Sequence, residues 1–539
     1  MSADLTTEVA VVGSGVAGAL AAAKLAEAGI DVVILEAGPR ITREAAVQSF
    51  AEAPIRSPDA PYPVTAAAPY PRRGDPDGYV IESGPDTFGP SYIRLVGGTT
   101  WHWLGACPRL VPDDFRMKSR FGRAVDWPIA YEDLEPWYAQ AERALGVAGD
   151  DADDLGSPRS SGYPMAAMPL SYLDLQVAER LAGSPYPSLP TPYARNTADW
   201  NGRPPCCGAA SCIPICPSGA KYDAMVHVAR AEAAGARILE RCVVHKLELA
   251  PDRRIASLLY RRPDRSDVRL RAKVFVLAAH GIETPKILFM SRGEGAPDGL
   301  ANSSGVLGRF LMDHPYKLSW ALTKEPLWPY RGPIRLSAVN STRLGDRRAR
   351  VPAFRSGIDN SAYNWPLGGP TVTVRHLIRQ GLRGAALQQA ILDQTSRQIG
   401  LTALTEQLPD PENRVVADFD RRDALGLPRP RLHFRLDDYT KAGLAEAERV
   451  HEAIFALIGT SETHHRPGAM PGGHIMGTTR MGDDPRSSVV DPSLRAHDHP
   501  NLFLLGSGAF PTGGAANPTL TIAALSLRAV EPIKTALRA

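Results

Sequence analysis

Residues 8–38, EVAVVGSGVAGALAAAKLAEAGIDVVILEAG, carry the clearest fold signal in this chain. Val9–Val12 is a short apolar run, Ala19–Ala28 is rich in small helix-forming residues, and Val32–Leu35 is a second apolar run. Glycine-containing turns separate the three segments, so the order is strand, helix, strand. Such a unit is typical of a parallel sheet covered by helices. The stretch therefore predicts an α/β fold.

The first turn has the spacing G-x-G-x-x-G, made by Gly13, Gly15 and Gly18, and the second strand ends at Glu36. The first two glycines let the backbone approach a pyrophosphate at the helix N-terminus, and the third lets helix and strand pack closely. A carboxylate at this place accepts hydrogen bonds from ribose hydroxyls. In this setting the motif predicts a dinucleotide site and weighs against a glycine turn that binds nothing. It does not distinguish FAD from NAD.

Four of the six cysteines stand within residues 206–220, CCGAASCIPICPSGA. Their spacing, C-C-x4-C-x3-C-P, is made by Cys206, Cys207, Cys212 and Cys216. A long chain has little need of disulfides to hold its core, and C-x3-C-P also occurs where thiolates hold iron–sulfur clusters. Spacing alone leaves three interpretations open: an iron–sulfur cluster, a structural zinc ion, or buried thiols with one disulfide.

Bulk properties set wide limits. The chain has 539 residues, enough for more than one domain, and a net charge of +3 without a basic run, so nothing indicates a nucleic-acid partner. No segment approaches the ~18 apolar residues of a membrane span. A signal peptide begins with a basic segment, whereas the amino terminus of this chain has Asp4 and Glu8. A signal peptide is therefore not expected here.

The carboxyl-terminal region contains a second set of motifs. Residues 501–530, NLFLLGSGAFPTGGAANPTLTIAALSLRAV, predict a strand over Leu502–Leu505, a glycine turn, and a helix with Asn517 as N-cap and Pro518 as its first residue. The N-terminus of such a helix suits an anionic reduced flavin. His474 lies upstream in a glycine-rich loop, where a lone histidine is ordinarily a surface or packing residue.

Together, six stretches resemble the glucose–methanol–choline oxidoreductases: VVGSGVAGALAAAKLAEAG, VGGTTWHW, AAHGIETPKILFMS, GRFLMDHP, HIMGTTRMGDD and NLFLLGSGAFPTGGAANPTLTIAALSLR. The resemblance runs from the first strand to the last helix. Within the family, the cysteine loop and GGTTWHWLGACPRLVPDDF look like the catalytic subunits of bacterial FAD-dependent glucose dehydrogenases, with fructose, sorbitol and gluconate dehydrogenases as near relations.

The resemblance implies FAD as the dinucleotide and assigns roles to residues of this sequence. His474 corresponds to the family's catalytic histidine, which takes a proton from the substrate hydroxyl while hydride passes to flavin N5, and Asn517 corresponds to its hydrogen-bonding partner. His102, His280, His314 and His497 are expected to shape the flavin site or to pack. The expected cofactor-binding residues are Gly13, Ser14, Gly15, Gly18, Glu36, Ala37, Gly97, Gly98, Thr100, Val244, Ala278, Gly508, Ala509, Asn517 and Thr519.

The resemblance also implies a [3Fe–4S] cluster on Cys206, Cys207 and Cys212, with Cys216 unligated. The spacing equally allows a [4Fe–4S] cluster with four thiolates. A cluster takes electrons from a reduced flavin one at a time, which indicates a dehydrogenase that feeds a protein acceptor. The relatives act with a small subunit that bears a twin-arginine signal and with a multihaem cytochrome c. The expected location is therefore the periplasmic face of the inner membrane, with the cytoplasm as the alternative.

The expected activity is oxidation of a hydroxyl of a sugar or polyol, with glucose as first choice. Gluconate, fructose or glucoside dehydrogenase activity is the alternative within the family. An oxygen-using alcohol oxidase and a flavin-containing lyase are alternatives on the same fold, whereas His474 and Asn517 count against a non-catalytic electron-transfer module.

The expected architecture is a Rossmann-type FAD-binding domain interleaved with a substrate domain built on a mostly antiparallel β-sheet. The FAD-binding domain should comprise 1–45, 78–110, 220–315 and 470–539, with a helical insertion and cysteine loop over 111–219. Strands are expected at Val274–Leu277 and in CVVHKLEL (242–249), with a helix opening at Thr284-Pro285. The substrate domain, 316–469, should contain strands in YKLSWALT, PTVTVRHL, NRVVADF and RPRLHFRL and a helix in YTKAGLAEAERVHEAIFAL.

Overall fold

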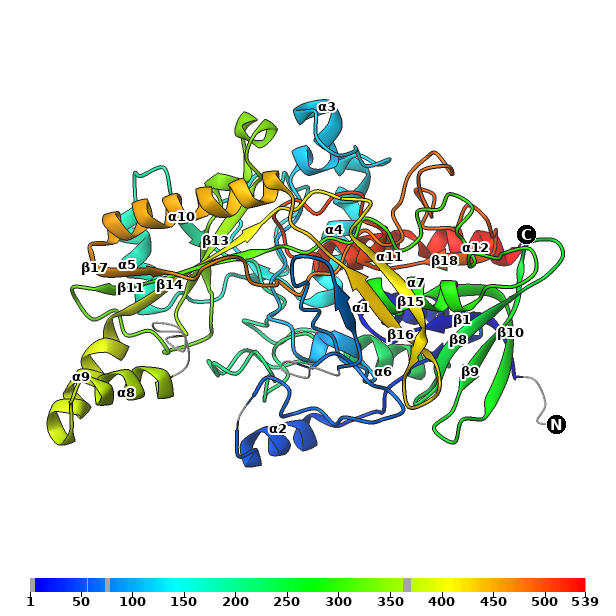
Figure 1. Cartoon of the computed structure of the whole chain (residues 1–539), viewed down its shortest axis with the longest axis horizontal. Coiled ribbons are helices and arrows are strands. Elements are labelled where there is room, and N and C mark those ends of the chain that lie inside the picture. The colour runs from blue at the N-terminus through cyan, green and yellow to red at the C-terminus, as the bar shows by residue number, and fades with distance from the viewer. Residues whose placement is uncertain (1–4, 56, 73–77, 362–369, 539) are drawn as a thin grey trace.

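The computed structural model describes residues 5–55, 57–72, 78–361 and 370–538, so Asp4 lies outside the described residues. Two large β-sheets stand at opposite ends of the molecule, with helices and loops between and around them (Figure 1). Within the described ranges, no helix is long and apolar enough to cross a membrane.

The first sheet is built around β1, which carries the glycine motif at its carboxyl end. β1 pairs in parallel with β2 and β10, so that Val9 lies beside Val32 on one side and beside Val274 on the other. Both faces of this sheet are buried at these strands, which explains why the strands are continuously apolar. The three strands predicted there are confirmed. The sheet order is β7 (Arg237–Leu239), β2 (Val32–Leu35), β1 (Leu5–Val12), β10 (Asp267–Leu277), β9 (Ile255–Arg261) and β8 (Val243–Leu249), with β18 (Leu502–Leu504) paired to β10.

Small residues bring the first helix close to this sheet. A Cβ added to Gly18 would lie 2.0 Å from the carbonyl oxygen of Gly13, so only glycine allows the observed approach. The helix begins at Val16, three residues before the predicted start at Ala19, because Gly15 acts as its N-cap. Helices packed on this sheet are α1 (Val16–Glu27), α6 (Met225–Ala233), α7 (His280–Met290) and α12 (Val530–Arg538), and α11 (Thr519–Arg528) packs against α1.

The predicted start of α7 at Thr284-Pro285 is wrong, since the helix begins at His280. Pro285 lies inside the helix, where it cannot donate to the carbonyl of Gly281 four residues earlier. That carbonyl instead accepts a hydrogen bond from the Thr478 hydroxyl at 2.6 Å. A side chain distant in sequence thus makes the proline tolerable, and local sequence gives no sign of it.

The second sheet is antiparallel throughout, which confirms the mostly antiparallel sheet. Alternate residues of β13, such as Phe354 and Ile358, pack on one face with residues of α5 and α10, and the opposite face borders a cavity. Figure 1 shows α10 lying along this sheet. The sheet order is β17 (Thr460–His465), β11 (Tyr316–Thr323), β14 (Gln398–Thr405), β13 (Phe354–Asp359), β12 (Ser337–Val339) and β6 (Ser188–Pro190), and the two helices are α5 (Tyr172–Leu181) and α10 (Asp438–Ile458).

The strand predicted for PTVTVRHL is wrong: these residues belong to helix α8 (Pro370–Arg379), which is followed by α9 (Gly384–Arg397). The β-branched residues favoured a strand by propensity alone. In the structure Thr373 and Leu377 are buried and Arg375 is exposed, which is the four-residue spacing of a helix face. Packing therefore overrides propensity here.

Two other predicted strands form, but in a different sheet. NRVVADF lies in β15 (Arg414–Arg422) and RPRLHFRL begins in β16 (Pro428–His433), and both join β3 (Ile81–Ser83) rather than the large antiparallel sheet. The parallel pairing of β16 with β3 joins segments about 350 residues apart in sequence, which no local pattern indicates. The other elements are α2 (Arg43–Glu52), α3 (Met117–Phe121), α4 (Tyr131–Leu145), β4 (Ala148–Gly149), β5 (Met165–Ala166), η1 (Gly98–Trp101), η2 (Pro112–Phe115), η3 (Ser341–Arg343), η4 (Asp346–Ala349) and η5 (Ser507–Ala509).

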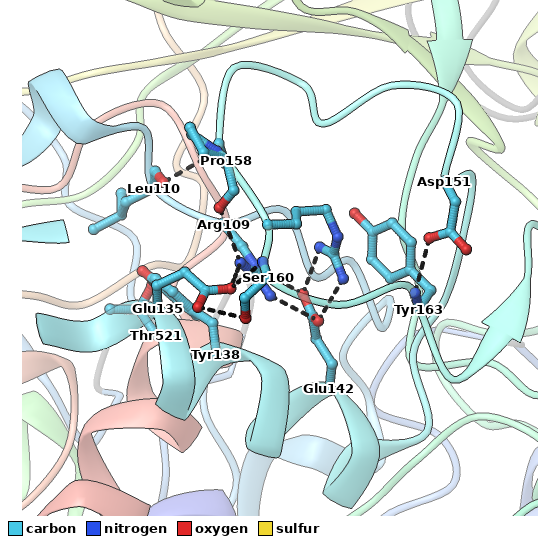
Figure 2. Close-up of polar contacts among 12 residues, drawn as sticks. Arg109, Leu110, Glu135, Tyr138, Glu142, Asp151, Pro158, Ser160, Tyr163 and Thr521 are labelled. Carbon is cyan, nitrogen blue, oxygen red and sulfur yellow. Dashed lines mark hydrogen bonds and ion pairs between the residues drawn. The ribbon is translucent and has the colours of Figure 1, made fainter. Parts of the chain in front are cut away.

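A buried ion-pair cluster ties α4 to the segments before and after it. Glu135 and Glu142 point from α4 toward Arg109 (Figure 2), with N–O distances of 2.8 and 2.9 Å. Glu142 also pairs with Arg159 at 2.7 Å, and the side chain of Glu142 is only 1% exposed. One carboxylate therefore compensates two guanidinium groups away from water.

Replacement of Glu142 by alanine should destabilise the protein by about 3–5 kcal/mol, the usual cost of removing one partner from a buried pair. Arg109 would keep only Glu135, and Arg159 would lose its sole carboxylate partner among the described residues. Thermal unfolding of the purified protein measures the loss. Gln140→Ala, an exposed change on the same helix, should stay within about 0.5 kcal/mol of the parent. Equal melting temperatures for both variants would contradict a stabilising role for the cluster.

Candidate active site

A cavity of about 1240 Å³ lies between the two large sheets. The glycine motif and the end of β2 form part of its wall, and the face of the antiparallel sheet opposite α5 and α10 forms another part. His474 and Asn517 also line it. The cavity is therefore long enough to reach both the predicted nucleotide site and the sheet that was expected to face the substrate.

Glu36 is fixed at the nucleotide end by a compact set of hydrogen bonds. Its Oε2 accepts from the backbone N of Ser14 at 3.0 Å and from the Ser14 hydroxyl at 2.6 Å, while its Oε1 accepts from Gly38 N at 3.0 Å. The Ser14 oxygen in turn accepts from Gly97 N at 3.0 Å. Burial raises the pKa of Glu36, and these donors oppose that rise. The carboxylate is thereby held at the cavity wall, where a ribose hydroxyl can reach it.

The glycines of this region fit a bound pyrophosphate. Gly13 has φ +99°, and a Cβ there would lie 2.4 Å from the carbonyl oxygen of Ala278. Gly15 lines the cavity with open space around its Cα, since an added Cβ would meet no described atom within 4 Å. Gly98 packs over Gly15, because a Cβ added to Gly98 would lie 3.0 Å from the Gly15 Cα. The residues present therefore fit FAD, with the phosphates beside Gly15 and the N-terminus of α1.

Most of the predicted cofactor-binding residues line the cavity, and five lie behind its wall. Gly508 faces the Thr479 side chain instead, because a Cβ added to it would lie 2.7 Å from the Thr479 hydroxyl. Gly506 and Ser507 line the cavity in its vicinity. The predicted residues that line it are Gly13, Gly15, Glu36, Ala37, Gly98, Thr100, Val244, Ala278, Asn517 and Thr519, and those that do not are Ser14, Gly18, Gly97, Gly508 and Ala509.

The sequence predicted Asn517 as the N-cap of the following helix, and this prediction is wrong. The N-cap position is Pro518, and α11 begins at Thr519. The Asn517 side chain turns instead toward His474, and its Nδ2 donates to His474 Nε2 at 3.2 Å. Its Oδ1 is buried and has no hydrogen-bond partner among the described residues. That oxygen is an acceptor free for a ligand.

His314, expected only to shape the site or to pack, fixes the tautomer of His474. The Nε2 of His314 lies 2.9 Å from the carbonyl oxygen of Gly514, and a carbonyl only accepts, so this nitrogen carries the proton. Neutral His314 therefore has its lone pair on Nδ1, which lies 2.9 Å from His474 Nδ1. His474 must then donate from Nδ1 and keep its lone pair on Nε2, on the side of Asn517.

Both imidazoles are kept neutral by their surroundings. Burial lowers the pKa of His314 to about 4. Burial, and then the neighbouring His314, hold the pKa of His474 well below its usual value. Asp313 fixes the loop beneath them by accepting backbone N–H bonds from His474 and Gly472 at 2.7 Å each. The result is a neutral, oriented imidazole with a lone pair available at neutral pH.

The cysteine loop lies beside the cavity but does not form a ready metal site. Cys212 and Cys216 are buried, Cys207 is exposed, and all are free thiols. Within residues 5–55, 57–72, 78–361 and 370–538, no three Cys, His, Asp or Glu side chains are gathered as metal ligands. The three-cysteine ligand set therefore stays a prediction. The chemistry of the donor set still suits an iron–sulfur cluster, since four soft thiols occur on one short loop.

Lys221 attaches this loop to the cavity wall. It is buried, and its Nζ donates to the carbonyl oxygens of Trp101, Trp103 and Cys212 at 2.9, 2.6 and 2.9 Å. Ile213, next to Cys212, lines the cavity together with Trp103. The loop is thus a neighbour of the expected flavin site.

Comparisons with known proteins agree with this geometry. The family models described as GMC oxidoreductase match residues 94–316 and 409–526, and the model described as FAD dependent oxidoreductase matches residues 8–148. The chain is 37% identical over 538 residues to the fructose dehydrogenase large subunit of Gluconobacter japonicus, with 98% of each chain covered. It is 25% identical to the gluconate 2-dehydrogenase flavoprotein of Pantoea cypripedii, covering 98% of this chain and 93% of that one.

A solved structure shows the same fold. Pyridoxine 4-oxidase from Mesorbium loti superposes with a TM-score of 0.61 at 17% identity, covering 98% of this chain and 99% of the other. The family resemblance drawn from the motifs is therefore confirmed over the whole length. The chain belongs to the GMC oxidoreductases, and it is an FAD-dependent enzyme of that family.

Proposed function

We propose that this enzyme is a dehydrogenase that oxidises a hydroxyl group of a sugar or polyol. The observation that carries the proposal is the His474 Nε2 lone pair, which lies at the cavity 3.2 Å from the Asn517 amide. The similarity to a protein named fructose dehydrogenase large subunit supports a carbohydrate substrate. Glucose, the first choice from the sequence, and fructose, named in that relative, are the first two substrates to try.

In this arrangement a substrate hydroxyl binds beside His474 Nε2 and Asn517 Nδ2 and replaces the hydrogen bond between these two atoms. The hydroxyl donates its proton to His474 Nε2, and the Asn517 Nδ2–H donates to the same oxygen as negative charge develops on it. His314 holds His474 in the correct tautomer throughout. Bound FAD would supply the acceptor for the hydride that leaves the carbon.

An anaerobic screen of sugars and polyols tests this proposal. Loss of flavin absorbance near about 450 nm on substrate addition is expected for at least one of them. Fast oxygen consumption with that substrate would indicate an oxidase instead. Product formation without any flavin bleaching would indicate a lyase and overturn the proposal.

The rate of flavin reduction should stay constant as pH falls through about 6.5, the ordinary value for histidine. Only neutral His474 accepts a proton, and a lowered pKa means that protonation begins at a lower pH. Below that pKa, kcat/KM should fall about tenfold per pH unit. Flavin content measured over the same range separates this effect from acid release of FAD. A midpoint at or above 6.5 would contradict the assignment of a desolvated base.

We further propose that Cys206, Cys207 and Cys212 hold a [3Fe–4S] cluster, with Cys216 nearby and unligated. The position of the loop beside the cavity supports this proposal, because a bound cluster would supply a one-electron acceptor close to the flavin. Burial raises the pKa of Cys216, but hydrogen bonds from Lys221 N and Ser218 and the charges of Lys221 and Arg43 lower it on balance. Burial, by contrast, raises the pKa of Cys206, one of the three proposed ligands.

The proposed partners are a small subunit that carries a twin-arginine signal and a multihaem cytochrome c that accepts the electrons. The designation of the relative as a large subunit supports a partner subunit. We propose the periplasmic face of the inner membrane as the site of action, reached through these partners.

A further inference from the structure

Arg355 is a buried cation in the cavity wall, and its hydrogen-bond partners among the described residues are neutral. Its side chain stands on β13 and is 7% exposed. Its Nε donates to the Asn340 Oδ1 at 3.0 Å, and its Nη2 donates to the Thr191 hydroxyl. Its Nη1 makes no hydrogen bond to a described residue, and no carboxylate of the described ranges lies within 4.0 Å of the guanidinium.

Four other buried arginines of this protein are held by carboxylates or by carbonyl oxygens. Arg109 and Arg348 each pair with two carboxylates. Arg195 and Arg343 are held by backbone carbonyls, and neither lines the cavity. Arg355 differs from these four because it lines the cavity, and it differs from the cavity-lining Arg94, which pairs with Glu283, because it has no carboxylate partner among the described residues. An unpaired buried charge is costly, so a ligand that brings the opposite charge would gain from meeting it.

The charge balance of this wall is positive. Arg335 also lines the cavity, and its Nη2 lies 3.4 Å from Asp359 Oδ2 and 3.3 Å from the Thr402 hydroxyl. Asp359 thus pairs with Arg335, and Arg355 has no carboxylate partner among the described residues. Burial lowers the pKa of Arg355, and the nearby Arg335 adds to this effect. The exposed Arg466 stands on the same cavity wall.

Strand register places Arg355 within reach of the catalytic pair. Tyr316, Leu404 and Arg355 are direct cross-strand neighbours on β11, β14 and β13, and all three line the cavity. Neighbouring strands are about 5 Å apart, so the row spans about 10 Å between the Cα atoms of its ends. The ring of Tyr316 lies 6.3 Å from that of His474, edge to face. His474 and Arg355 thus line one cavity and are connected along its wall by Tyr316 and Leu404.

We propose that the substrate carries a carboxylate, that Arg355 binds it, and that the substrate is therefore a sugar acid such as an aldonate or uronate. The guanidinium offers N–H groups to the carboxylate oxygens, while a hydroxyl of the same molecule binds beside His474 Nε2 and Asn517 Nδ2. Asp359 beside Arg335 disfavours a doubly charged phosphate ester at this place. The inference rests on the proposed dehydrogenase function and specifies its substrate class.

The test measures anaerobic flavin bleaching of the holoenzyme with pairs of substrates that differ by a carboxylate. The pairs are gluconate and glucose, and galacturonate and galactose. The acid of a pair should show a kcat/KM at least about tenfold above that of the neutral sugar, since charge-assisted hydrogen bonds contribute about 1.5–3 kcal/mol. Arg355→Gln should lower kcat/KM for the acid by about 10- to 100-fold, chiefly through KM, and leave the neutral sugar within about threefold. Arg355→Lys should restore part of the loss.

Two controls keep the outcome interpretable. Arg449→Gln, an exposed change on α10, should alter neither substrate. In the parent enzyme, a simple carboxylate such as propionate should compete with the sugar acid, which tests the site even where a variant fails to fold. Equal rates for acids and neutral sugars, or a preference for glucose 6-phosphate, would overturn the carboxylate assignment while leaving the dehydrogenase proposal intact. Failure of every hydroxyl compound to bleach the flavin would overturn the dehydrogenase proposal itself.

Discussion

His474→Ala should lower the rate of flavin reduction by ~10² to 10⁴-fold while the enzyme keeps its FAD. The side chain contributes the proton acceptor next to Asn517, and the nucleotide end of the cavity is built from other residues, chiefly around Glu36. Alanine removes the Nε2 lone pair without adding bulk. The ground-state binding of FAD therefore loses little, whereas the transition state loses its base.

Stopped-flow reduction with the best substrate of the screen measures this effect, and the visible spectrum reports flavin content. His376→Ala on α8, an exposed histidine outside the cavity lining, provides a matched control and should leave the rate unchanged. A His474→Ala enzyme that reduces its flavin at the parent rate would remove His474 from the role of base. Loss of FAD from the variant would instead assign the residue to cofactor binding.

Serine at Cys206, Cys207 or Cys212 should separate two activities. Flavin bleaching by substrate should persist, because it requires only the cavity residues and FAD. Electron delivery to a cytochrome or an electrode should fall to background, since the proposed one-electron acceptor loses a ligand. Some loss of soluble protein is expected, because metal binding and the ordering of a loop are coupled.

Cys216→Ser is the matched control in the same loop, and it should be mild if three thiolates hold the cluster. Iron analysis and electron paramagnetic resonance of the parent enzyme test the cluster directly, since an oxidised [3Fe–4S] cluster is paramagnetic and zinc is silent. Stoichiometric zinc without iron would end the electron-relay proposal. Equal losses in all four variants would favour a four-thiolate cluster.

The nucleotide site was predictable because its determinants are local. The requirement for glycine at Gly13 and Gly18 follows from backbone conformation and close helix–strand packing, and these are expressed within one short stretch. The same applies to Glu36, whose partners Ser14 and Gly38 lie within about one strand–helix–strand unit. Apolar runs likewise identified the buried strands of the first sheet.

Local signals failed where distant residues decide the outcome. PTVTVRHL has strand propensity but buries Thr373 and Leu377 on one side of a helix. Pro285 is accepted inside α7 only because Thr478 bonds the carbonyl that the proline leaves free. Asn517 does not cap α11, and its side chain instead forms a hydrogen bond with His474, 43 residues away. In each case a tertiary contact outweighs a local preference of comparable or smaller free energy.

By itself, the sequence determined the family, the dinucleotide motif, the catalytic pair His474 and Asn517 as candidates, and the cysteine loop as a candidate cluster site. Only the tertiary structure decided that His314, 160 residues from His474, sets its tautomer, and that Arg355 faces the same cavity without a carboxylate partner among the described residues. The physical reason is that proton position and charge compensation depend on which groups lie within hydrogen-bond distance. Those distances are set by sheet register and loop packing across the whole chain, not by neighbours in sequence.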